Sequence, residues 1–96
     1  MPIAHLTLEL RIEGAHSLKD KRQVVRSLKD RLRAGFNVSV AEMDPSEAWQ
    51  RATIGVVAIS ASKDYLTGLM ENIERRATAI ANNAGADVVD SFMYFL

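Results

Sequence analysis

The 96-residue sequence contains no cysteine, two prolines and only six aromatic residues of the Phe, Tyr and Trp types. Without cysteine there is no disulfide, no thiolate nucleophile and no cysteine-based zinc site. No apolar run approaches the roughly 18 residues that span a bilayer. The first ten residues lack the basic segment and long apolar run of a signal peptide. We therefore expect a cytoplasmic protein without a membrane segment.

The composition is otherwise that of an ordinary globular protein, with 48% hydrophobic and 25% charged residues. A chain of this length has room for one hydrophobic core, so residues 1–96 are predicted to form a single domain.

The formal net charge is zero, but the charges are segregated along the chain. Residues 17–33 contain seven of the twelve basic residues and only two acids, and the remainder contains five bases and ten acids. Segregated charge produces a local field even when the total cancels. Functional residues are therefore expected mainly in this segment.

The hydrophobic pattern predicts six elements in the order β-α-β-β-α-β. Residues 3–13, 36–43, 49–60 and 86–96 have the alternating or short apolar patterns of strands. Residues 18–34 and 63–83 carry apolar residues at helical spacing, with Ser17 and Ser62 as N-caps and glycines after the helices. Residues 44–47 are predicted to form a turn around Pro45.

Two right-handed β-α-β units of this kind predict an α+β fold, the ferredoxin-like βαββαβ sandwich. It contains a four-stranded antiparallel sheet with both helices on one face. The first and third strands should be central.

Five basic residues of the first predicted helix follow one another at spacings of 3, 4, 3 and 4, which places them along one side of the helix. Two interpretations are open: a solvated helix face with the basic stems covering apolar surface, or a contact strip for RNA phosphates or an acidic partner. We call these residues the basic stripe: Lys19, Arg22, Arg26, Lys29 and Arg33.

The sequence contains few residues whose arrangement suits catalysis. His16 and Ser17 lie where a helix begins, which allows an anion site, but an ordinary loop histidine beside an N-cap serine explains the pair as simply. No third residue is placed to complete a triad, and no residue spacing suits a metal. No catalytic residue, metal or cofactor is therefore predicted, and an enzyme is less expected than a binding protein.

The face of the sheet opposite the helices is expected to carry no aromatic platform on its two central strands, in contrast to RNA-recognition domains. It should carry an apolar patch instead, and such patches mark partners, commonly a second copy of the chain. Trp49 is expected at the edge of the core, with an interface position as the alternative. The predicted dimer face consists of Ala41, Met43, Val57 and Ile59.

Three segments resemble the bacterial YlxP-like family, also called domain of unknown function 503. They are Ser17-Leu18-Lys19 with Lys21-Arg22, Phe36-Asn37-Val38-Ser39 with Glu42, and Trp49-Gln50-Arg51-Ala52. The resemblance implies a ferredoxin-like fold and, from the genes that often lie beside those of the family, a connection with RNA or the ribosome. It implies no catalytic residues.

The sequence thus predicts a small non-enzymatic binding module that contacts RNA or a ribosome-associated partner through the basic stripe. Two alternatives stay open. One is a homodimeric assembly protein with protein partners only. The other is a small anion-binding enzyme or sensor at His16 and Ser17.

Overall fold

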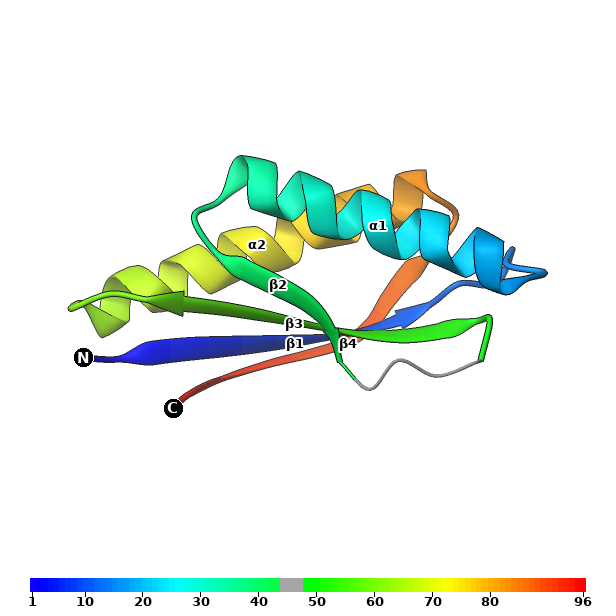
Figure 1. Cartoon of the computed structure of the whole chain (residues 1–96). Coiled ribbons are helices and arrows are strands. Elements are labelled where there is room, and N and C mark those ends of the chain that lie inside the picture. The colour runs from blue at the N-terminus through cyan, green and yellow to red at the C-terminus, as the bar shows by residue number, and fades with distance from the viewer. Residues whose placement is uncertain (44–47) are drawn as a thin grey trace.

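A computed structural model describes residues 1–43 and 48–96 of the chain, and the turn predicted at 44–47 lies outside them. The described elements follow the predicted order (Figure 1). They are β1 (Ile3–Arg11), α1 (Leu18–Gly35), β2 (Ser39–Met43), β3 (Arg51–Ile59), α2 (Lys63–Asn83) and β4 (Asp87–Phe95).

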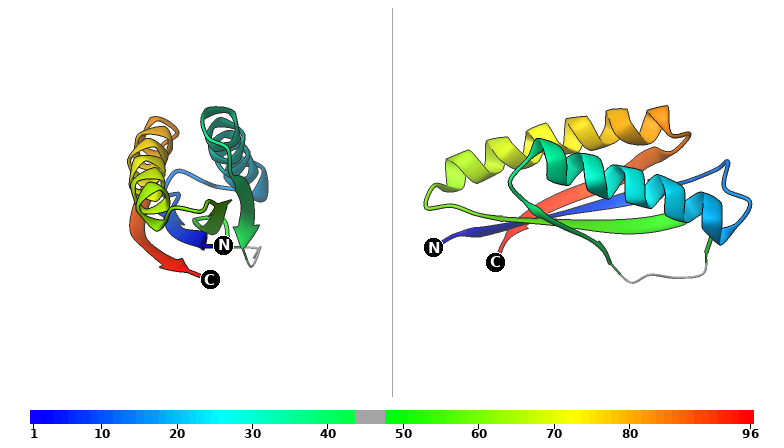
Figure 2. Two further views of the ribbon diagram at one scale, coloured as in Figure 1. Left: turned by 90° about the vertical axis from the view of Figure 1, so that its left-hand side faces the viewer. Right: turned by 45° about the horizontal axis from the view of Figure 1, so that its top comes forward.

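The four strands form one antiparallel sheet in the order β2-β3-β1-β4. β1 and β3 pair without interruption from Ile3 opposite Ile59 to Arg11 opposite Arg51. Both helices cover one face of this sheet, α1 on the β2 side and α2 on the β4 side (Figure 2). The predicted ferredoxin-like sandwich, with its first and third strands central, is therefore confirmed.

The core lies between the sheet and the helices. The alternating pattern of β1 buries Ala4, Leu6, Leu8 and Leu10 against the helices, although Thr7 on the opposite face is also largely covered. α1 contributes Val25, Leu28 and Leu32, which recur every three or four residues as the amphipathic pattern requires. α2 completes the core with Leu66, Met70, Ile73, Ala77, Ile80 and Ala81.

The helix ends follow the predicted caps at three of four positions. Ser17 and Ser62 each accept a backbone N–H three residues into their helix. α2 ends at Asn83 with Ala84 as its C-cap, and the next residue, Gly85, has a φ of 81° that requires a residue tolerant of the left-handed region. Gly35 differs, because it is the last residue of α1 itself and the extended Phe36 ends the helix.

Several apolar side chains lie outside the core. Leu18 and Leu69 are only half-buried, and Ala84 is exposed just beyond the end of α2. Trp49 is 49% exposed, so its expected place at the core edge is wrong; it lies in the segment just before β3. Lys21, in contrast, is unexpectedly buried.

Candidate functional site

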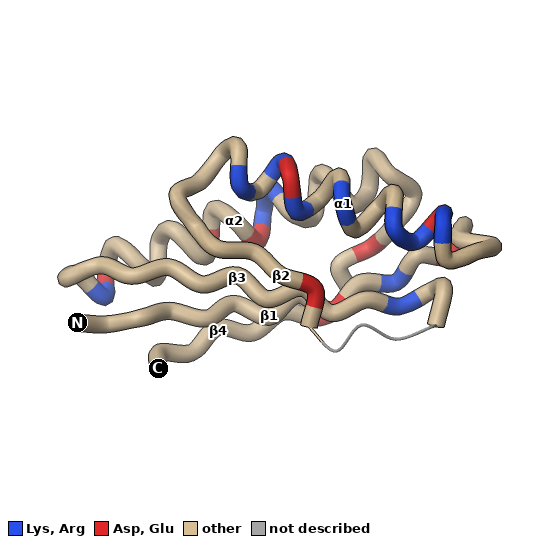
Figure 3. The backbone as a smooth tube through the Cα atoms, in the orientation of Figure 1, with Lys and Arg blue, Asp and Glu red and all other residues tan. Residues whose placement is uncertain are grey.

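The basic stripe lies along the side of α1 that faces β2. The helix buries Lys21, Val25, Leu28 and Leu32, and the residue after each of them is a cation of the stripe. One residue corresponds to about 100° of rotation, so the cations follow the edge of the buried surface. The stripe therefore borders the sheet instead of pointing straight away from it. Figure 3 shows the Lys and Arg positions that follow one another along α1.

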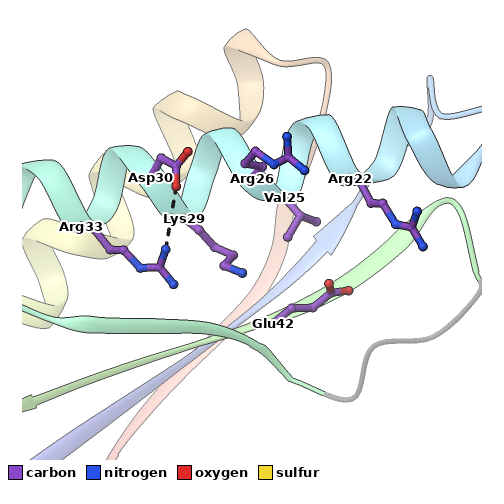
Figure 4. Close-up of a pocket in the computed structure, with 7 residues that line it drawn as sticks. All are labelled: Arg22, Val25, Arg26, Lys29, Asp30, Arg33 and Glu42. Atoms are coloured by element: carbon purple, nitrogen blue, oxygen red, sulfur yellow. Dashed lines mark ion pairs between the residues drawn. The ribbon is translucent and has the colours of Figure 1, made fainter.

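Four members of the stripe line a groove of about 330 Å³ between α1 and β2. Lys19, in the first turn of the helix, is exposed but does not contribute to this lining. Figure 4 shows the groove, with α1 above and Glu42 reaching up from β2 below. We call it the cationic groove; its lining residues are Arg22, Val25, Arg26, Lys29, Asp30, Arg33 and Glu42.

Arg33 is held in place by its neighbours. Its Nη2 donates to the backbone oxygen of Val40 at 2.8 Å, and its Nη1 lies 3.8 Å from Oδ1 of Asp30. These contacts attach the end of α1 to β2 and partly neutralise the guanidinium. Arg33 is thus more a structural residue than a free ligand for a partner.

The carboxylate of Glu42 is also engaged. Its Oε2 lies 3.4 Å from Nζ of Lys21, and the two side chains are 21% and 4% exposed, respectively. A buried ammonium needs a compensating charge, because desolvation of an isolated ion costs several kcal/mol. Glu42 therefore serves mainly to compensate Lys21 and only secondarily to reduce the charge of the groove.

Three of the four cations that line the groove differ from Arg33 in this respect. Within residues 1–43 and 48–96, the side chains of Arg22, Arg26 and Lys29 form no ion pair or hydrogen bond with another residue. The helix rises by seven residue steps from Arg22 to Lys29, about 10 Å at 1.5 Å per residue. The groove thus presents a row of uncompensated positive charge to the solvent.

Sequence reasoning missed the role of Lys21, although a signal was present. Lys21 precedes Val25 by four residues and Leu28 by seven, so it falls on the apolar stripe of the helix. A lysine at such a position predicts a buried acid from another element. Which acid it would be depends on the packing of α1 against β2 and was not readable from spacing.

His16 and Ser17 are arranged as an ordinary helix start. The Ser17 hydroxyl accepts the Asp20 N–H at 3.1 Å, and Oδ2 of Asp20 accepts the His16 N–H at 2.9 Å. A bound anion would have to replace this carboxylate. The local geometry therefore does not favour the predicted anion site.

The face of the sheet without helices carries the four residues of the predicted dimer face. Met43 and Ile59 are 40% and 60% exposed, and the Met43 side chain lies over Gly55, where an added Cβ would come within 2.8 Å of the Met43 Sδ. Ala41 pairs with Gly55, and Val57 lies two residues further along β3, so both are close to this contact. That this surface binds a second copy of the chain remains a prediction.

The same face also carries two aromatic residues that sequence reasoning overlooked. Phe92 and Tyr94 of β4 are 50% and 43% exposed, and they lie opposite Thr7 and His5 of β1. The Tyr94 hydroxyl and His5 Nδ1 form a hydrogen bond, and the two rings meet edge to face with centroids 4.9 Å apart. Their place on this face was not readable from the sequence, because β4 carries apolar residues on both faces.

Neither membrane insertion nor metal binding finds support in the described part of the chain. None of its helices is long and apolar enough to cross a bilayer. No group of three or more His, Asp or Glu residues there is arranged to hold a metal ion.

Comparison with known proteins identifies a family and a fold. A family model described as a protein of unknown function, DUF503, matches residues 3–93. The uncharacterised protein YlxP of Bacillus subtilis is 40% identical over 52 residues, and this match spans 54% of the chain and 56% of YlxP.

Two solved structures illustrate the likeness in fold. Arabidopsis thaliana MSL1 superimposes with a TM-score of 0.63 at 18% identity, over 93% of this chain and 34% of MSL1. A de novo designed protein with a ferredoxin fold superimposes with a TM-score of 0.58 at 9% identity, over 100% of this chain and 84% of the design. At these identities the likeness concerns the fold alone.

Proposed function

The chain belongs to the DUF503 family of uncharacterised proteins, and we propose that it is a non-enzymatic module that binds RNA through phosphate contacts in the cationic groove. One observation carries this proposal: the three cations Arg22, Arg26 and Lys29 are aligned in a groove and are not compensated by described residues. The expected cytoplasmic location is consistent with such a role and remains a prediction.

The chemistry of the groove favours a phosphate backbone over an acidic protein surface. Energetically important protein–protein contacts usually centre on buried aromatic or apolar anchors. Val25 is the only apolar side chain in the described lining of the groove. Aligned cations with little apolar surface suit a ligand that carries a regular series of negative charges. Such contacts position a nucleic acid without reading its sequence.

Phosphate contacts make the affinity depend on salt in a calculable way. Each contact with single-stranded RNA contributes about −0.7 to the slope of log K against log salt, so three contacts give a slope of about −2. A rise from 50 to 200 mM salt should then weaken binding roughly 20-fold. Double-stranded RNA would give a somewhat steeper loss.

Filter binding to purified ribosomal RNA, at both salt concentrations, tests the proposal. The variant Arg22→Glu/Arg26→Glu should bind at least about tenfold more weakly and show a shallower salt slope. A matched control is Arg75→Glu/Arg76→Glu, which makes the same change in total charge at exposed positions of α2. This control should retain most of the affinity.

Three outcomes would contradict RNA binding through phosphate contacts in the cationic groove. They are negligible retention at both salt concentrations, equal losses in the two double variants, and an affinity that does not change with salt. If the chain instead captures proteins from lysate regardless of nuclease treatment, and the Arg22→Glu/Arg26→Glu variant does not, the groove binds an acidic protein.

A further inference from the structure

The two edges of the sheet differ in how well they are protected. A helix packs over one face of each edge strand, α1 over β2 and α2 over β4. β2 has only five residues, and the Arg33 guanidinium occupies the backbone oxygen of Val40. β4 is a nine-residue edge strand. Residues 86–96 contain no Lys, Arg or Pro, the residues with which proteins commonly block edge pairing. The β4 edge is therefore the one more accessible to another strand. A register shift between Glu9 and Leu10 interrupts the pairing of β1 with β4 near the start of β4.

The backbone groups available at this edge can be identified. The N–H of Leu96 donates to the Ile3 oxygen at 2.8 Å, so Leu96 faces β1. In an antiparallel pair such residues alternate with residues whose N–H and C=O point away. Phe92 and Tyr94 therefore bond to β1 as well, whereas Ser91, Met93 and Phe95 direct their backbone groups outward. The outward N–H of Ser91 currently donates to its neighbour Asp90, at 2.9 Å from Oδ1.

The side chains of β4 are compatible with pairing to an identical strand. A two-fold axis at Met93 would place Phe92 of each copy opposite Tyr94 of the other, on the helix-free face. Directly opposed aromatic residues are a stabilising cross-strand pair. Asp90 would lie opposite Leu96 of the other copy, so no two carboxylates would face each other in this register. This register also places outward-facing residues opposite each other. The backbone groups of Ser91 in one copy would form hydrogen bonds with those of Phe95 in the other.

From these observations we propose that β4 pairs antiparallel with β4 of a second copy of the chain, with the two-fold axis at Met93. The sheets of the two copies become one continuous sheet. Tyr94 is prepared for this contact, because its bond to His5 fixes the ring before association.

The proposed dimer leaves the cationic grooves accessible. β2 and β4 lie at opposite edges of the sheet, so the groove beside β2 is remote from the new contact. The dimer would carry one groove at each end. Its existence does not depend on RNA binding, and either proposal can fail alone.

Amide exchange of the intact chain, followed by NMR at rising protein concentration, tests the register directly. The N–H groups of Met93 and Phe95 should exchange quickly in dilute solution and at least about tenfold more slowly when the dimer forms. The N–H groups of Phe92 and Tyr94 face β1 and should be slow throughout, which provides an internal control. Sedimentation over the same range should show the mass rising from 10.6 kDa to twice that value.

Variants separate this edge contact from a dimer through the helix-free face. Met93→Lys places two like charges at the axis and should weaken association at least about tenfold, whereas the neutral Met93→Gln should not. Ile59→Lys lies on the helix-free face of β3 and should leave the edge dimer intact. If Met93→Lys does not fold, the amide-exchange measurement on the unmodified chain still shows whether the copies pair through β4.

Several results would overturn the proposal. A monomer at millimolar concentration would do so, as would a dimer in which the Met93 and Phe95 amides exchange as fast as in the monomer. A dimer lost in Ile59→Lys and kept in Met93→Lys would show that the copies meet through the helix-free face instead.

Discussion

The ion pair between Lys21 and Glu42 gives the most demanding test of how α1 is fixed to the sheet. We expect Glu42→Gln to remove a charge that compensates Lys21 while nearly preserving the shape of the side chain. Breaking a buried pair from one side costs about 3–5 kcal/mol. Because Glu42 is 21% exposed and water can partly replace it, a loss of about 2–3 kcal/mol is the appropriate expectation. For a domain of this size that corresponds to a decrease in Tm of roughly 10–20 °C.

The two partners should not be equivalent. Lys21 is the deeply buried member, so water reaches its ammonium less easily than it reaches the Glu42 carboxylate. Lys21→Met should therefore cost less than Glu42→Gln, since Glu42 can be hydrated at the rim of the groove. The double variant Lys21→Met/Glu42→Leu should lie close to the original stability, because well-packed apolar residues often replace a buried ion pair without loss.

Urea unfolding, with the free energy extrapolated to water, measures each variant. Glu13→Gln is the matched control, because the pair between Arg11 and Glu13 is similar in distance, 3.5 Å, but both side chains are more than half exposed. Its loss should be within about 0.5 kcal/mol. If Glu42→Gln costs no more than Glu13→Gln, the inference that Lys21 depends on Glu42 is wrong.

Three further predictions concern helix ends and RNA. Gly85→Ala should destabilise the chain by about 1–2 kcal/mol in thermal unfolding, because a φ of 81° disfavours a Cβ even though the space around it is open. Ser17→Ala should lose about 1 kcal/mol while Ser17→Gly loses only a few tenths, and equal losses would argue against a capping role. Lys29→Ala should reduce the salt slope of RNA binding by about 0.7 without altering the Tm by more than a degree or two; an unchanged slope would remove Lys29 from the contact.

The backbone arrangement was predictable because its signals are local. The alternation of β1 and the three- and four-residue spacing in α1 depend on side chains a few positions apart, and they identify the buried face directly. Ser17 and Ser62 mark the helix starts for the same reason. The right-handed crossover rule then leaves few ways to connect the elements.

The site was predictable only in part, because it lies between elements distant in the sequence. Helical spacing placed Arg22, Arg26 and Lys29 on one side of α1, but it could not show that β2 forms the opposite wall. The contribution of Glu42 therefore appeared only with the structure. Phe92 was missed for a related reason: β4 has apolar residues on both faces, so its sequence does not distinguish the exposed face from the buried one.

The contacts that hold α1 to β2 lie on either side of the three uncompensated cations of the cationic groove. Lys21 is bound to Glu42 near the start of α1, and Arg33 is bound to Val40 and Asp30 near the end. These two attachments use cations for structure and fix the distance between helix and strand. Arg22, Arg26 and Lys29 lie between them, on a segment whose position is already determined. A ligand for these three side chains would order only the side chains and not the backbone, which lowers the entropic cost of binding.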